Sequence, residues 1–499
     1  MNKWLNFVSV QFFSVVFVTV VLYFSIPRKY RWYVLFASSC YFYAVAAGKG
    51  AVLVAFVTIS IAYIFALWIE KAAGDRKKKK LYMAIAVILI VSLWAVLKRK
   101  RYVPYDFAWL VVPLGISYYT FSLIGYLADV YYRKEPAEHN ILKLSLYTLY
   151  FPKIMQGPIS KFRFIGPQLI EGHVWDYQRV CYGLQRILWG YFKKLVIAER
   201  AALMTESVFH DFSDYSGGGA VLIVTTVIAT FRHYCDFSGY MDIVTGISQI
   251  MGIQLEDNFR QPFFSKSAAE FWRRWHITLG VWFKDYVYMP LAIDPKVIRL
   301  SGWMRARFGK RAGKAVLTMI PLAAVWLLTG LWHGTGVRYI VWGVYWGSII
   351  IFSNVFAPEI SWLTRVLRIN TESVDWHIFQ ILRTFALFMA GLVCSTFVGL
   401  RELKRYAWIV IRKFELPQLW DKTIYSYGLD KNNMMILYVS IVILLMVETE
   451  QQKGSVREKI GNLNAVSRWI IYAAAVLYVA FLGIYGPGYS IRDFEYMFF

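Results

Sequence analysis

The sequence is poor in charge and in cysteine. Only 17% of its 499 residues are charged, well below the roughly 25% that is typical of a soluble domain. The four cysteines lie far apart and form no C-x-x-C pair, which argues against a disulfide framework and against a zinc knuckle. No internal repeat is visible, which counts against transporters built from inverted repeats. The sequence is rich instead in hydrophobic residues, at 58%, and in aromatic residues, at 18%.

Long apolar runs separate clusters of charged residues. Several of these runs are shorter than the ~20 residues that a straight transmembrane helix needs. The first run is followed by PRKYRW (27–32) and not by a small-residue cleavage site, so we expect a retained span. We predict an all-α polytopic membrane protein with about 11–12 transmembrane helices. Runs that could cross a bilayer lie near 7–25, 33–47, 51–69, 81–97, 107–131, 179–198, 217–250, 315–335, 338–356, 378–399, 432–447 and 469–485.

Two further stretches, 142–165 and 258–292, are aromatic, moderately polar and broken by Pro or Gly. Irregular backbone at membrane depth is tolerated only where protein buries it or where it lines a cavity. We therefore expect re-entrant or interfacial helices in both stretches. We interpret 1–499 as one integral membrane domain, with a core at 110–356 and C-terminal helices and an aromatic tail at 378–499.

Positive charge exceeds negative charge, with 55 Lys and Arg against 31 Asp and Glu and a net charge of +24. No arginine-rich arm, zinc module or RNA-binding signature accompanies this excess, so we expect the lipid bilayer and no nucleic acid as a partner. The positive-inside rule explains the excess and places the loops 71–80, 292–314 and 451–459 in the cytoplasm. The last apolar run, 469–485, would then cross the membrane from the cytoplasm to the outside, so we expect the C-terminal tail to be extracytoplasmic. The basic stretch 97–102 does not fit this alternation.

Ionisable residues interrupt several of these stretches, and such groups at membrane depth commonly line a cavity or a pathway. His333 lies among Gly330, Gly334 and Gly336, which would bring backbone close and leave room beside an imidazole. Histidine suits proton transfer near neutral pH, and a core histidine bonded to a carbonyl is the alternative. The other ionisable residues are Arg232, His233, Asp236, Asp242, Glu270, Arg273, Arg274, His276, Lys284 and Asp285.

His276 also has two interpretations, because it could be a reactive imidazole or a structural one in an interfacial helix. His233 and Cys235 have H-x-C spacing, but no second pair of ligands accompanies them. We therefore expect no metal site. Nor do side chains two apart on a helix face each other as a nucleophile and its base would.

Four segments carry a distinctive combination of aromatic, basic and glycine residues: FPKIMQGPISKF (151–162), DFSGYMDIVTGISQIMGIQLEDNFRQPF (236–263), EFWRRWHITLGVWFKDYVYMPL (270–291) and LTGLWHG (328–334). Together they resemble the membrane-bound O-acyltransferase superfamily. The similarity is greatest to the bacterial branch that acylates cell-surface polymers, which includes alginate and peptidoglycan O-acetylation proteins and the teichoic acid D-alanylation protein. It runs from about residue 113 to residue 356, and more loosely across the chain.

The resemblance implies a ring of helices around a thin funnel-shaped core, with a central tunnel from a cytosolic donor side to an outer acceptor side. His333 would be the catalytic histidine, and His276 its partner along the tunnel. The chain would be a multi-pass protein of the bacterial cytoplasmic membrane. It would transfer an acyl group, expected to be acetyl, from acetyl-CoA or an acyl carrier to a cell-surface polysaccharide. No bound cofactor is expected besides this acyl-thioester co-substrate.

The sequence ends on FEYMFF (494–499), which matches an F-x-Y-x-x-F ending that recurs in this branch. The resemblance implies that Tyr496 carries the acyl group temporarily at the outer mouth of the tunnel. The alternative is an aromatic belt at the membrane interface. Since the chain has no G-x-S-x-G elbow, the family also implies an extracytoplasmic SGNH-type transferase partner.

Other functions remain open at this point. The D-alanylation system carries the aromatic motif on a separate peptide, so a fused motif favours O-acetylation over teichoic acid D-alanyl transfer. A lipid or protein acyltransferase of the same superfamily would not need the tail. A polymer transporter or flippase would need no acyl intermediate, and a structural scaffold would leave both histidines and the tail unexplained.

Overall fold

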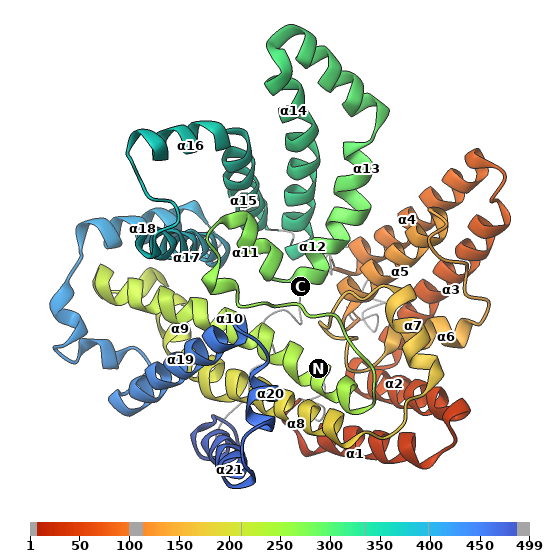
Figure 1. Cartoon of the computed structure of the whole chain (residues 1–499), viewed down its shortest axis with the longest axis horizontal. Coiled ribbons are helices and arrows are strands. Elements are labelled where there is room, and N and C mark those ends of the chain that lie inside the picture. Colours follow the sequence, from red (N-terminus) through yellow and green to blue (C-terminus); the bar gives the residue numbers. More distant parts are fainter. Residues whose placement is uncertain (1–6, 99–112, 211, 335, 398, 487–499) are drawn as a thin grey trace. The chain divides into compact units, whose positions relative to one another are not determined.

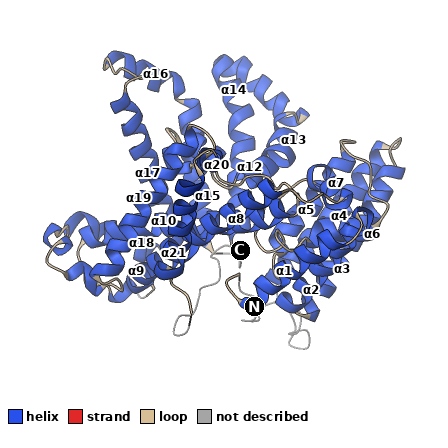
Figure 2. Cartoon of the chain, turned by 60° about the horizontal axis from the view of Figure 1, so that its bottom comes forward, coloured by secondary structure: helices blue, strands red, loops and turns tan. Residues whose placement is uncertain are grey.

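The computed structural model describes residues 7–98, 113–210, 212–334, 336–397 and 399–486. This part of the chain is helical, and its only β pairing is an isolated bridge between Phe259 and Trp275 (Figure 2). Seven of its helices are long and apolar enough to cross a membrane, or eight if the bent pair α15 (Val337–Val355) and α16 (Ala357–Val366) is one span. The prediction of an all-α polytopic membrane protein is confirmed. Several shorter apolar runs form helices of 15–17 residues, and the tunnel stays a prediction.

The described residues form two compact units, and the first comprises the chain up to Gly190 together with Tyr240–Asp257. Polar side chains begin several of its helices: Ser9 accepts from the Phe12 amide at the start of α1, and Asn140 accepts from two amides at the start of α6. Its helices are α1 (Val10–Ser25), α2 (Arg31–Ala47), α3 (Lys49–Lys71), α4 (Arg76–Lys98), α5 (Ile116–Tyr131), α6 (Ile141–Leu149), α7 (Phe162–Glu171) and α8 (Tyr177–Tyr191) (Figure 1).

The second unit comprises Tyr191–Gly239 and the chain from Asn258 onward. It starts with a π-helical segment, Phe192–Ala198, and contains most of the long helices. The helix α10 (Gly219–Ile250) begins in this unit and ends in the first. The others are α9 (Glu199–Phe209), α11 (Ala268–Arg274), α12 (Ile277–Phe283), α13 (Met289–Ala292), α14 (Pro295–His333), α15 (Val337–Val355), α16 (Ala357–Val366), α17 (Val374–Thr396), α18 (Leu400–Arg412), α19 (Lys431–Gln452), α20 (Val456–Gly461) and α21 (Ala465–Leu482).

The basic segment 292–314, which we expected to be a loop, is mostly helical. Asp294 accepts a hydrogen bond from the Lys296 amide, Pro295 occupies the first turn, and the helix continues to a break at Gly309. Gly309 has φ 89°, which glycine adopts at little cost, and α14 then resumes in the opposite direction. The Ser301 hydroxyl donates to the Gly313 carbonyl at 2.7 Å, so the two arms form a helical hairpin (Figure 1). The basic residues therefore lie around the tip of a hairpin.

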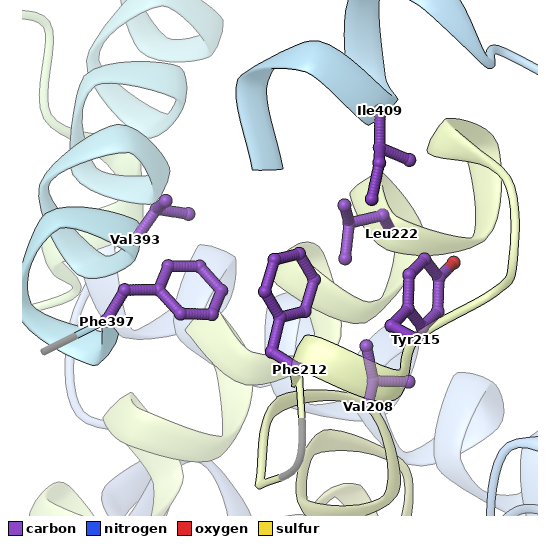
Figure 3. Packing of buried hydrophobic residues seen from close by; sticks show 7 residues of the cluster. All are labelled: Val208, Phe212, Tyr215, Leu222, Val393, Phe397 and Ile409. Atoms are coloured by element: carbon purple, nitrogen blue, oxygen red, sulfur yellow. The ribbon is translucent and has the colours of Figure 1, made fainter. Parts of the chain in front are cut away.

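A small core joins helix ends in the second unit. Phe212 lies next to Phe397, with ring centroids 4.6 Å apart, and stacks on Tyr215 at 5.8 Å (Figure 3). Ile409 of the amphipathic helix α18 completes the same cluster from above, together with Val208, Leu222 and Val393. Because Ile409 is buried while Trp408 and Ile411 are exposed, α18 has one side on the protein and apolar side chains outside it.

Both stretches that we predicted to be broken consist of short helices. Residues 142–165 form α6, a turn and the start of α7. Residues 258–292 form α11, α12, a π-helical segment at Lys284–Tyr288 and α13. The breaks in the sequence therefore identify breaks in the helices.

Candidate active site

His276 occupies the junction between α11 and α12. It has φ 46° and ψ 52°, in the left-handed region, and its side chain is only 3% exposed. A non-glycine residue in this region costs of order 1–3 kcal/mol, and such residues persist where the surroundings fix them, often at functional sites. The backbone conformation thus distinguishes His276 from an ordinary helical histidine.

The strand-like segment at Asn258–Arg260 fixes this junction. The Ile277 amide donates to the Asn258 carbonyl at 3.0 Å, and the Arg260 amide donates to the Arg274 carbonyl at 2.9 Å. The Asn258 side chain then accepts from both the amide and the hydroxyl of Thr278. These bonds satisfy backbone groups at the break between two helices, so they hold His276 in its strained conformation.

The His276 imidazole lies among aromatic rings. Its centroid is 4.9 Å from that of Phe237 in an edge-on arrangement and 6.1 Å from that of Trp332. Burial lowers the pKa of the His276 imidazole well below its usual value, because charging it would require desolvating the cation. A histidine that stays neutral at physiological pH can orient or polarise a partner through hydrogen bonds.

His333 is the last residue of α14 and is 8% exposed. Its ring centroid lies 4.8 Å from that of Trp332 and 4.7 Å from that of Trp342 on α15. Trp332 therefore contacts both histidines. His276 and His333, which lie 57 positions apart in the sequence, therefore meet in one aromatic cluster.

Glycines bring α14 and α15 together beside His333. A Cβ on Gly330 would lie 2.5 Å from the Tyr339 carbonyl oxygen, and one on Gly334 would lie 2.0 Å from the Tyr339 ring. On the facing helix, a Cβ on Gly343 would lie 2.5 Å from the Trp326 carbonyl oxygen. The expected close approach of backbones is confirmed at Gly330, whereas Gly334 lies against a side-chain ring. A Cβ on Gly336 would have its nearest contact at 3.8 Å, so Gly336 makes no similar close approach.

The tryptophans around the histidines were not selected from the sequence. Trp272 of α11 packs edge-on against Trp326, Trp342 and Trp346, with centroids 5.0–5.5 Å apart. Such geometry is favourable for aromatic pairs and gives α11, α14 and α15 a shared rigid interface. The aromatic-rich motifs EFWRRWH and LTGLWHG carried the signal, since each places a tryptophan beside its histidine.

Most of the other ionisable residues that the sequence singled out have structural partners. Asp236 accepts from Lys194 at 2.6 Å, and Lys194 also contacts Glu199 at 2.8 Å, all three being buried. In the first unit, Asp242 accepts from Arg186 at 2.9 Å. The remaining pairs are Arg232 with Thr205 and Glu206, Arg274 with Glu270, and His233 stacked on Trp275.

The described residues contain no group of three or more potential metal ligands. Tyr496 and the tail lie outside these residues, as does most of the basic stretch 97–102. The roles of His333, His276 and Tyr496 thus stay predictions, although the structure brings the two histidines together.

Residues 40–399 match a family described as MBOAT, membrane-bound O-acyltransferase family. Both His276 and His333 lie within the matched region. A probable alginate O-acetylase of Pseudomonas fluorescens is 30% identical over 377 residues, which cover 74% of this chain and 68% of that protein.

The names of two other relatives refer to other polymers, peptidoglycan and teichoic acid. A peptidoglycan O-acetyltransferase of Helicobacter pylori is 26% identical over 430 residues, covering 76% of this chain and 77% of that protein. A teichoic acid D-alanyltransferase of Bacillus subtilis is 29% identical over 284 residues, covering 55% of this chain and 66% of that protein.

Proposed function

The chain belongs to the membrane-bound O-acyltransferase family, and from this premise we propose that it transfers acetyl groups from a cytosolic thioester to a cell-surface polysaccharide. It is an O-acyltransferase and a multi-pass membrane protein, so the transporter and scaffold interpretations are set aside. The observation that carries the proposal is the contact of Trp332 with both His276 and His333, inside the region that matches the family. The membrane would be the bacterial cytoplasmic membrane.

Two observations favour acetyl over D-alanyl as the transferred group. The similarity to the Pseudomonas fluorescens and Helicobacter pylori relatives covers 74% and 76% of this chain, against 55% for the Bacillus subtilis D-alanyltransferase. The chain also contains the F-x-Y-x-x-F motif itself, as FEYMFF at 494–499. A D-alanyl transferase for teichoic acid is the second candidate.

His333 is assigned the role of general base. The Tyr496 hydroxyl attacks the thioester carbonyl, its oxygen forms the new C–O bond, and the C–S bond breaks. The phenolic proton passes to His333 and then to the departing thiolate, which leaves as a thiol. Complete prior transfer from a phenol (pKa ~10) to an imidazole (pKa ~6.5) would be uphill by about 5 kcal/mol, so the proton moves as attack proceeds.

His276 is assigned a positioning role. An imidazole that burial keeps neutral can orient His333 or the thioester carbonyl by hydrogen bonding, without adding a buried charge. The O-acetyl tyrosine is an activated phenol ester, so it can pass the acetyl group to a sugar hydroxyl. An extracytoplasmic SGNH-type partner would complete this second transfer.

The test is intact-mass analysis of the C-terminal peptide after incubation of the membrane-embedded protein with isotope-labelled acetyl-CoA. We expect an acetyl adduct on Tyr496 in the wild type, and none in His333→Ala or Tyr496→Phe. Were the wild type to remain unlabelled while its cells still acetylate their polymer, Tyr496 would be an interfacial anchor and the relay would be wrong. A D-alanyl adduct with the corresponding donor would select the second candidate.

A further inference from the structure

A single helical turn in the first unit places two polar side chains in a buried position that the proposed mechanism does not use. The turn follows α6, and the amides of Ile154 and Gly157 donate to carbonyls four residues earlier, at 3.1 and 2.9 Å. Lys153 and Gln156 are three residues apart on this turn, so their side chains extend on the same side. Lys153 is 4% exposed and Gln156 is 0% exposed.

The Gln156 carboxamide has no hydrogen-bond partner among the described residues, at either its oxygen or its nitrogen. A buried amide without partners is costly, and most buried polar side chains are satisfied. Two other buried polar side chains of this unit have hydrogen-bond partners. The Tyr147 hydroxyl donates to the Ser160 carbonyl at 2.7 Å, and the Ser160 hydroxyl donates to Glu256.

The turn has little room to move so that the Gln156 carboxamide could reach a hydrogen-bond partner. Gly115, at the start of α5, has φ 71°, and a Cβ there would lie 1.8 Å from the Ile154 carbonyl oxygen. The Lys153 ammonium lies over the Tyr147 ring, 4.1 Å from its centroid, which fixes the other polar side chain of the turn. Gln156 is thus held in place while its carboxamide oxygen and nitrogen have no hydrogen-bond partner among the described residues, as expected for a side chain that binds a ligand.

We propose that Gln156 binds a secondary amide of the pantetheine arm of the acyl-thioester donor. A ligand amide offers one N–H and one C=O, which match the acceptor and donor ends of a carboxamide. A phosphate or a carboxylate would satisfy only the donor end. The pantetheine arm carries two such amides, and this inference rests on the proposed function for the presence of a thioester donor.

The experiment compares acetyl-CoA binding to the nanodisc-embedded wild type, Gln156→Met and Gln168→Met. Methionine keeps the length of the side chain and removes its hydrogen bonds. We expect Gln156→Met to bind acetyl-CoA about tenfold more weakly or worse, since the ligand amide loses its partner. Its melting temperature should be equal to or above that of the wild type, because an unsatisfied amide has been removed.

Gln168 is the matched control, because its amide is already satisfied by the Phe164 carbonyl and the Gln254 amide. Gln168→Met should lower the melting temperature and leave acetyl-CoA affinity unchanged. Equal affinity of the wild type and Gln156→Met for acetyl-CoA would overturn the inference, as would a lowered melting temperature in Gln156→Met with unchanged binding.

A second measurement uses the wild type alone and does not depend on the variants folding. Pantetheine should compete with acetyl-CoA for binding, and a polyether thiol of the same length without amides should not. Equal competition by both thiols would contradict the inference. Because these readouts are of binding, loss of acetyl transfer with binding intact would count against the proposed reaction and leave the role of Gln156 standing.

Discussion

Two regions of the second unit bury ionisable side chains in different ways. Around Lys194 opposite charges are paired, since its ammonium contacts both Asp236 and Glu199. Around His276 and His333 the imidazoles pack against the rings of Phe237, Trp332 and Trp342. The first arrangement holds three helical segments together through ion pairs. In the second arrangement, the imidazoles of His276 and His333 lie within a rigid cluster of aromatic rings. We infer that the first region supports the fold and that the second performs the chemistry.

The largest expected effect comes from breaking the ion cluster with Lys194→Met. Two buried carboxylates would lose their cation, and breaking a buried pair in this way costs about 3–5 kcal/mol. The thermal stability of the detergent-solubilised protein should fall steeply. Lys453→Met is the control, because Lys453 pairs with Glu450 at 2.7 Å on the exposed surface and such pairs contribute about 0–1 kcal/mol. Similar losses in both variants would contradict the comparison.

The next effect concerns the contact between α14 and α15 beside His333. Gly330→Ala would place a methyl group 2.5 Å from the Tyr339 carbonyl oxygen, so the helices must separate. Overpacking of this kind costs about 1–3 kcal/mol. We expect a lower melting temperature and a fall in acetyl transfer. Gly336→Ala, whose Cβ has only ordinary contacts, should retain both properties. If Gly330→Ala kept full activity, the close approach would not matter for the site.

A smaller effect should follow from Trp332→Phe, which keeps an aromatic ring but reduces its contact with both histidines. We expect about a tenfold fall in kcat, equivalent to about 1.4 kcal/mol, with little change in melting temperature. Trp303→Phe serves as the control, because Trp303 is 53% exposed on the α14 hairpin. An equal loss in the control would indicate a general effect of removing tryptophan.

The smallest effect tests a carboxyl group that belongs to the first unit. Burial, with a contribution from Asp129, raises the pKa of Glu135 to about 7. The folded state then favours the protonated form, so this group stabilises the protein below pH 4.5 and that contribution is lost as the pH rises to 7. Glu135→Gln should flatten the fall in melting temperature across this pH range. An unchanged pH profile would show that Glu135 titrates normally.

The sequence predicted the parts of the fold that hydropathy and chain breakers determine. Apolar runs located the long helices, and Pro or Gly located the interrupted segments. The α14 hairpin was missed because the density of Arg and Lys suggested a loop, although Asp294 and Pro295 form a helix start and the helix continues through Gly302 to a break at Gly309. Charge alone does not end a helix.

The candidate site was only partly predictable for a different reason. His276 and His333 were found through their motifs, whereas Trp342 and Asn258 were not, because their roles depend on packing between separate helices. Asp236 was a candidate for function from its apolar surroundings. Its partner Lys194 lies 42 positions earlier, so the ion pair could not be recognised from local sequence.

The most direct test of the central claim is the release of thiol from acetyl-CoA by the nanodisc-embedded protein, with membranes supplying the acceptor. Wild type, His333→Ala and His276→Ala would be compared once their melting temperatures show that all three proteins are folded. We predict that His333→Ala loses about 10²- to 10⁴-fold in rate, the range for removal of a general base, and that His276→Ala loses less. Thiol release at the wild-type rate by a folded His333→Ala protein would contradict the assignment of this site.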